Sequence, residues 1–91
     1  MSAKYTTSEV ITQLVPGKAY SYDTKGKNSV RFIVDAMAAS NGFIVNGARL
    51  PEGTHTFGAS DPYGVMGDIL DIQVPSVFCI VTQIVTTVRI I

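Results

Sequence analysis

The sequence predicts an all-β fold: a compact antiparallel β-sandwich of jelly-roll type, or a small β-barrel, with about seven or eight short strands. Short apolar runs rich in β-branched and aromatic residues alternate with turn sequences such as Pro-Gly and Asn-Gly. No segment carries a helical hydrophobic pattern over about ten or more residues, which argues against βαβ units. Together these observations favour antiparallel strands joined by short turns.

The first expected strand is the ambiguous one. Thr6 and Glu9 could form a capping box that starts a helix over residues 7–15, which Pro16-Gly17 would end. The alternation of Val10, Thr12 and Leu14 instead fits a strand. The strand interpretation is favoured because the segments that follow are β.

The remaining strands follow from alternation and turn chemistry. In residues 29–38 Val30 and Phe32 share a face with apolar residues as far as Ala38, so one long strand is predicted there. Asn41-Gly42 and Asn46-Gly47 are expected to be hairpin turns on either side of a very short strand. Further strands are predicted at residues 18–23, 53–58 and 68–74, and in the closing run 77–91.

Composition indicates one domain over residues 1–91, with residues 1–7 a flexible N-terminal arm. One cysteine cannot form an internal disulfide, and no apolar leader follows Met1, so no secretory signal is expected. Only 15% of residues are charged, whereas soluble domains average about 25%. Because a small domain has a large surface for its volume, we expect part of this surface to be covered by other subunits. A monomer with an uncharged polar surface is the alternative.

The closing run "VFCIVTQIVTTVRII", residues 77–91, is too short for a membrane helix and is interrupted by Gln83 and Arg89. As a strand, its even-numbered face from Phe78 to Ile90 is expected to lie in the core, and residues 77–81 to be buried on both faces. Extended, the run would span roughly 50 Å, longer than the roughly 30 Å diameter of such a globule. It must bend within the domain or extend onto a neighbour.

Two sets of candidate binding residues follow. The low charge and the closing run suggest a protein interface, with the irregular segment 59–67 as a second contributor; its candidates are Tyr63, Val65, Met66, Val77, Cys79, Val81, Val85 and Ile91. Aromatic and basic residues near one hairpin suggest an alternative site for carbohydrate or single-stranded nucleic acid, formed by Tyr20, Tyr22, Lys25, Lys27 and Arg31. The zero net charge makes nucleic acid the less expected partner.

No catalytic or cofactor site is predicted. His55 and Cys79 could in principle pair as base and nucleophile, but a cysteine in so apolar a strand is more often a packing residue. One histidine and one cysteine cannot supply a usual zinc site. The chain is therefore expected to be neither an enzyme nor a metalloprotein.

The succession "LVPGKAYSYD", "SVRFIVDA" and "GFIVNGARLPEGTHTFG" resembles small β-sandwich accessory proteins of tailed-phage virions, of the capsid decoration or cement type. The resemblance covers roughly residues 10–85 and is carried by β-turn motifs, so it transfers no functional residue. It implies a non-catalytic structural protein that forms homo-oligomers, with a trimer favoured, and docks on a capsid or tail lattice. The virion is then the expected location, and the cytoplasm if the protein is not phage-encoded.

Overall fold

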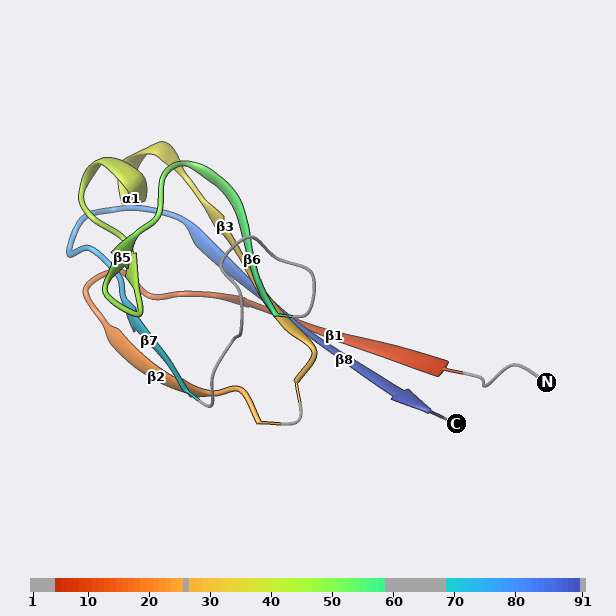
Figure 1. Ribbon diagram of the computed structural model, residues 1–91. Helices are drawn as coiled ribbons and strands as arrows, with labels where there is room; N and C mark the ends of the chain where they lie inside the picture. Colours follow the sequence, from red (N-terminus) through yellow and green to blue (C-terminus); the bar gives the residue numbers. More distant parts are fainter. Residues whose placement is uncertain (1–4, 26, 59–68, 91) are drawn as a thin grey trace.

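Two four-stranded antiparallel sheets pack face to face in the computed structural model, which describes residues 5–25, 27–58 and 69–90 (Figure 1). The first sheet has the order β1-β8-β3-β6 and the second the order β2-β7-β4-β5. Their bounds are β1 Tyr5–Gln13, β2 Ala19–Asp23, β3 Ser29–Val34, β4 Ile44–Val45, β5 Ala48–Arg49, β6 Gly53–Gly58, β7 Ile69–Gln73 and β8 Val81–Ile90. The predicted all-β sandwich is confirmed, and two separate sheets distinguish it from a barrel.

The core forms between the inner faces of the two sheets. In the first sheet the register places Val85 of β8 opposite Val30 of β3, and Val30 opposite Phe57 of β6. Phe32 lies at the centre, with its ring edge-on to those of Phe43 and Phe57 at centroid distances of 5.7 and 5.8 Å. The second sheet contributes the buried Leu70 and Ile72, as the alternation in residues 68–74 predicts, and also Val45 of β4.

A short helix interrupts the strand that was predicted over residues 29–38. Strand β3 ends at Val34, and helix α1 spans Ala36–Ser40. The Asp35 carboxylate is the N-cap and accepts a hydrogen bond from the Ala38 amide at 2.8 Å. Alanine and methionine in this segment favour helix, so the cap and the local propensity override the alternation that predicted a strand.

The two Asn-Gly pairs have different roles. Asn46 and Gly47, at φ 52° and 80°, form the predicted tight turn between β4 and β5. Asn41 and Gly42 instead end α1: Gly42 has φ 92°, and the Phe43 amide bonds the Ala38 carbonyl at 3.0 Å. That bond is the Schellman pattern, in which a glycine after the helix allows the chain to turn back. The prediction of a second hairpin turn here is wrong.

Strand β1 settles the ambiguity at the N-terminus in favour of the strand. Its nine residues pair antiparallel with β8, from Tyr5 opposite Ile90 to Gln13 opposite Thr82. Residues 5–7, expected in a flexible arm, therefore belong to the sheet. Residues 1–4 of that arm lie outside the described part of the chain.

The closing run has the opposite orientation from the one predicted. Its odd-numbered side chains Val81, Gln83 and Val85 lie in the core, whereas Phe78 and Ile80 on the even-numbered side are exposed. The prediction of an even-numbered core face is therefore wrong, as is the burial of residues 77–81 on both faces. The register with β3 decides the orientation, because Val81 and Val85 are opposite the buried Val34 and Val30.

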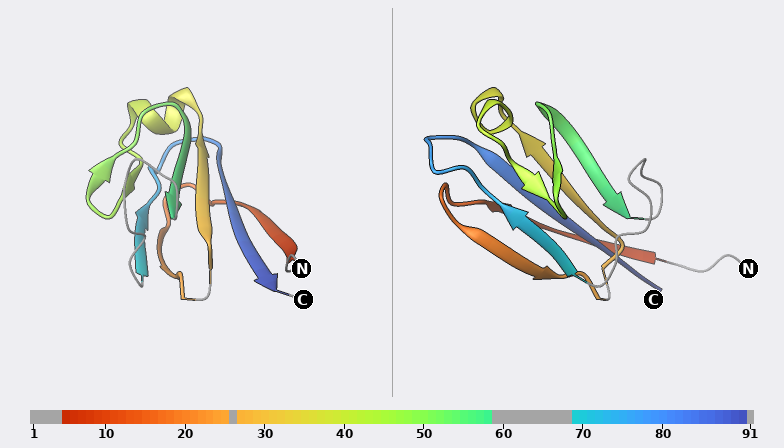
Figure 2. Two further views of the ribbon diagram at one scale, coloured as in Figure 1. Left: turned by 45° about the vertical axis from the view of Figure 1, so that its right-hand side comes forward. Right: turned by 60° about the vertical axis from the view of Figure 1, so that its left-hand side comes forward.

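The surplus length of the run extends beyond the body of the sandwich. Residues 77–80 form a loop, and β8 begins at Val81. Beyond Thr86 the strand has left its neighbour β3 and pairs with β1 alone, so β1 and β8 project together as a two-stranded ribbon (Figures 1 and 2). The molecule is accordingly elongated, with principal extents of 51 × 20 × 20 Å.

We predict that Asp35→Ala lowers the free energy of unfolding by about 2–3 kcal/mol. The carboxylate caps α1 through one oxygen and accepts from the Ile80 amide through the other at 2.8 Å, so it joins the helix to the loop before β8. Chemical denaturation measures the change. Asp35→Asn, which keeps one acceptor oxygen, is the control and should lose about half as much. A loss below about 0.5 kcal/mol for the alanine variant would contradict the role assigned to these bonds.

Candidate protein-interaction surface

The outer face of the first sheet carries an aliphatic surface that no other element covers within the described residues. We call it the outer aliphatic face; its members come from β1, β3, β8 and the loop before β8, and they are Ile11, Ile33, Ile80, Ile84 and Val88. Ile11 is 68% exposed and Ile80 is 45% exposed. The register places Ile84 between Ile11 on one side and Arg31 on the other. Exposed apolar side chains that share one face are typical of a surface that a partner covers.

Strand β1 forms the free edge of the same sheet. Every side chain from Thr6 to Gln13 is exposed, on both faces of the strand. Val10, on the inner face, is 61% exposed because β1 lies beyond the part of the sheet that the second sheet covers (Figure 2). An edge strand presents unpaired backbone groups to any strand that approaches it.

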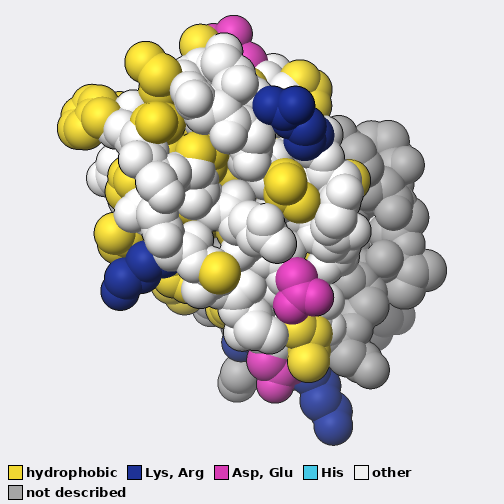
Figure 3. All heavy atoms as spheres, turned by 90° about the vertical axis from the view of Figure 1, so that its left-hand side faces the viewer, with side chains coloured by type: hydrophobic (Ala, Val, Ile, Leu, Met, Phe, Trp, Pro, Cys, Tyr) yellow, Lys and Arg dark blue, Asp and Glu magenta, His cyan; other side chains and the backbone are white. Residues whose placement is uncertain are grey.

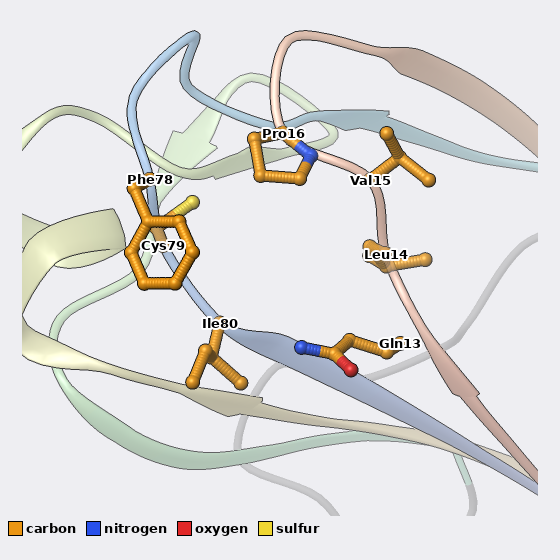
Figure 4. Close-up of a pocket in the computed structure, with 7 residues that line it drawn as sticks. All are labelled: Gln13, Leu14, Val15, Pro16, Phe78, Cys79 and Ile80. Carbon is orange, nitrogen blue, oxygen red and sulfur yellow. The ribbon is translucent and has the colours of Figure 1, made fainter.

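A groove of about 340 Å³ continues from the end of β1 toward the loop that precedes β8, and Figure 4 shows the residues that line it. Phe78 and Pro16 lie at one end, and Gln13 and Ile80 at the other. Phe78 is 87% exposed, an unusual position for a phenylalanine ring. Figure 3 views this end of the molecule and shows hydrophobic side chains exposed among uncharged groups, with Lys, Arg, Asp and Glu side chains around them.

The interface residues that the sequence suggested do not form this surface. Cys79, Val81 and Val85 are buried in the core, and Val77 packs against it. Side chains enclosed in one protomer offer no area to a partner, so the exposed residues of the opposite face replace them as candidates. The other four, Tyr63, Val65, Met66 and Ile91, lie outside the described residues.

Sequence reasoning missed the outer aliphatic face because it did not establish which strands are neighbours in the sheet. The signal is nevertheless present in the sequence. Strand β3 has Ile33 on the face opposite Phe32, and β1 has Ile11 on the face opposite Val10. Aliphatic residues on the non-core face of adjacent strands predict a second buried surface, once the strand order is known.

The alternative ligand-binding residues are not brought together. Tyr20 and Tyr22 are half-buried against the core, and the Tyr20 hydroxyl accepts a hydrogen bond from the Val15 amide at 3.0 Å. Arg31 points from the outer face of the other sheet, where it is exposed beside Ile84. Lys25 and Lys27 lie in the loop between β2 and β3. The arrangement gives no exposed aromatic platform flanked by these basic groups.

A second, more polar hollow of about 380 Å³ lies over β2 and β7, beside Ser21, Asp71 and Gln73. The Asp71 amide donates to the Asn46 side chain at 2.9 Å, and the Asn46 amide donates to the Asp71 carbonyl at 2.8 Å.

The described residues contain no obvious metal site. No three of their His, Cys, Asp or Glu side chains lie close enough together to hold a metal ion. In the same part of the chain, no helix is long and apolar enough to span a membrane.

Cys79 lies beneath the groove beside Phe78, on the loop before β8. Burial raises the pKa of its thiol, and the negative charge of Asp35 raises it further. The thiolate is the nucleophilic form of cysteine, so both effects keep this side chain unreactive. His55, the other residue considered for a nucleophilic pair, lies on β6 with its Nε2 2.7 Å from the Pro51 carbonyl oxygen.

Fold and surface together define a small antiparallel β-sandwich with one aliphatic outer face and one long free edge. No protein-family model matches the chain, and comparison with curated proteins and with solved structures finds no similar protein.

We predict that the Cys79 thiol of the native protein reacts with maleimide or iodoacetamide at least tenfold more slowly than a small model thiol. Because the pKa of the thiol is higher in the folded chain than its ordinary value of 9.0, protonation of Cys79 contributes to the free energy of unfolding. This contribution is fully present below pH 9.0 and is lost as the pH rises through the folded-state pKa. Mass spectrometry of quenched samples measures the labelling rate. The denatured chain serves as the control, and rapid stoichiometric labelling of native protein would contradict the prediction.

Proposed function

We propose that this protein is a non-catalytic structural assembly subunit that acts through protein–protein contacts. The observation that carries the proposal is the exposure of the outer aliphatic face, which lies on the face opposite the packed core. Isolated exposed aliphatic residues are normal, but here they occupy three adjacent strands of one sheet. Covering them removes apolar area from water at about 25 cal/mol per Å².

The low charge of the chain supports the same function. Seven basic and seven acidic residues in 91 leave little electrostatic repulsion between copies. Strand β1 has one charged residue, Glu9, among its nine. A protein that must remain dispersed usually carries more charge at its exposed strand edges.

Within this class we propose a virion accessory subunit, of the decoration or cement type, that docks on a capsid or tail lattice. The support is the resemblance in turn motifs and the small β-sandwich, together with the weakly charged and partly apolar surface. A sheet face with exposed aliphatic side chains is suited to contact with the broad surface of a lattice. The carbohydrate or nucleic-acid module is not favoured, because the tyrosines that it would use pack against the core.

The outer aliphatic face is tested by the double variant Ile33→Lys, Ile80→Lys. Both side chains are exposed in one protomer, so the variant should keep the stability of the fold while losing assembly. Sedimentation velocity and native mass spectrometry over a micromolar concentration series measure assembly, and chemical denaturation measures stability. The wild-type chain is expected to associate and the variant to associate at least tenfold more weakly.

The double variant Ser21→Lys, Gln73→Lys is the matched control, because both side chains are exposed on the outer face of the other sheet. It adds the same two charges away from the outer aliphatic face, so association should change little. A wild-type chain that stays monomeric throughout and binds oligonucleotides or glycans saturably would contradict the proposal. Equal association of all three proteins would show that the outer aliphatic face is not the contact.

A further inference from the structure

The alternation of hydrogen bonds along β1 shows which backbone groups face its free edge. The Leu14 amide donates to the Val81 carbonyl at 2.8 Å, so Leu14 and Val81 form a hydrogen-bonded pair. In an antiparallel ladder such pairs recur at every second residue. Even-numbered residues of β1 therefore direct their amides and carbonyls toward β8. The odd-numbered residues direct theirs outward, and they are Thr7, Glu9, Ile11 and Gln13.

This edge lacks most of the features that normally prevent strand addition. Natural edge strands are shortened, bulged, interrupted by proline or protected by charged side chains, above all lysine. Strand β1 is nine residues long, pairs with β8 without a bulge, contains neither proline nor lysine, and has Glu9 as its one charged residue. In Figure 2, left, β1 forms the right-hand margin of the molecule with no described strand beyond it. Such an edge is open to pairing with a partner strand.

The partner must also cover both faces of β1, because Val10 is exposed on one face and Ile11 on the other. An isolated extended peptide would satisfy the outward backbone groups but would leave much of these side chains in water. A strand that belongs to a second sheet, with its own neighbouring strands, continues both faces. A second copy of β1 fulfils this requirement and closes as a twofold pair.

The sequence of β1 selects one register for such a pair. A twofold axis at Glu9 places two carboxylates directly opposite each other, which is destabilising. An axis at Ile11 overlaps only residues 9–13 of each strand. Axes at Ser8 and at Val10 overlap residues 5–11 and 7–13, but only the axis at Val10 places the exposed Val10 side chains of both copies opposite each other. At Val10, odd-numbered residues face odd-numbered residues, so the outward backbone groups of both copies meet.

We propose that two copies of this chain join by antiparallel β1–β1 pairing about a twofold axis at Val10, which forms a continuous eight-stranded sheet. Val10 faces Val10 of the second copy in a non-hydrogen-bonded pair, where side chains are closest. Glu9 faces Ile11 of the second copy, so the two carboxylates are kept apart. The pairing covers the two exposed aliphatic side chains of β1, Val10 on one face and Ile11 on the other.

This inference rests on the proposed assembly function and names the partner of one edge. It differs from docking through the outer aliphatic face, because backbone pairing uses the edge of β1; Ile11 belongs to both surfaces, whereas Ile33, Ile80, Ile84 and Val88 belong to the outer aliphatic face alone. The twofold pair also replaces the trimer favoured by the resemblance as the smallest assembly, since an edge that pairs with itself is saturated by two copies.

Disulfide cross-linking tests the register. In a Cys79→Ala background, Val10→Cys should form a covalent dimer on mild oxidation, because residues in a non-hydrogen-bonded antiparallel pair have Cα atoms about 4.5 Å apart, within disulfide range. Thr12→Cys is the matched control on the same face of β1. In the twofold pair, position 12 of one copy is about 13 Å along the strand from position 12 of the second copy, too far for a disulfide. The double variant Ser8→Cys, Thr12→Cys should restore cross-linking, because those positions face each other.

Non-reducing electrophoresis and intact-mass analysis at low micromolar concentration give the yields. Efficient dimers for Val10→Cys and for the double variant, with little for Thr12→Cys, support the pairing. Equal yields at positions 10 and 12, or yields only with Glu9→Cys or Ile11→Cys, overturn the proposed register. Edge pairing fails if no cysteine variant cross-links. The proposed assembly function still stands in that case if the wild-type chain associates and the double variant Ile33→Lys, Ile80→Lys does not. If Val10→Cys cross-links and the outer-face double variant associates normally, edge pairing stands without that face.

Discussion

Strand β8 pairs with unequal lengths of chain on its two sides, and the rest of the structure depends on this mismatch. On one side it pairs with β1 over nine residues, and on the other it pairs with β3 over the six from Val81 to Thr86. The Asn28 side chain extends the shorter ladder by one bond, accepting from the Val88 amide at 2.8 Å. Beyond that point β1 and β8 pair with each other and with no other described strand. The two-stranded ribbon therefore projects from the sandwich, and β1 is left as a long, exposed edge.

The same strand determines which apolar side chains reach the core. Because side chains alternate between faces, the pairing of Val85 with Val30 and of Val81 with Val34 places Val81, Gln83 and Val85 inside. The core then includes Gln83, which is only 6% exposed, while Ile80, Ile84 and Val88 face outward. A one-residue shift in register would reverse this arrangement, so the outer aliphatic face is a direct consequence of the β3–β8 register.

Local signals in the sequence predicted the sandwich and several of its elements, but not the non-local choices. Alternation identified β7 through Leu70 and Ile72, and Asn46-Gly47 identified the β4–β5 turn. Helix α1 was missed because a five-residue Ala-rich segment is compatible with both the two-residue period of a strand and the 3.6-residue period of a helix. The Asp35 cap decides in favour of the helix. The core face of β8 could not be read locally, since both of its faces are rich in aliphatic residues; pairing with β3, far away in sequence, selects it.

The free edge and the outer aliphatic face reinforce each other physically if both are used in assembly. Edge pairing places two copies of the outer aliphatic face side by side on one continuous sheet, so each dimer would present twice the apolar area to a lattice. Once one copy has docked, the second is held near its own contact at a high effective concentration. Two weak contacts then produce a much stronger attachment without any new interaction. In the proposed assembly, this coupling would give a small, weakly charged chain a physical reason to keep β1 unprotected, because the exposed strand that would otherwise promote aggregation would be the contact that makes docking bivalent.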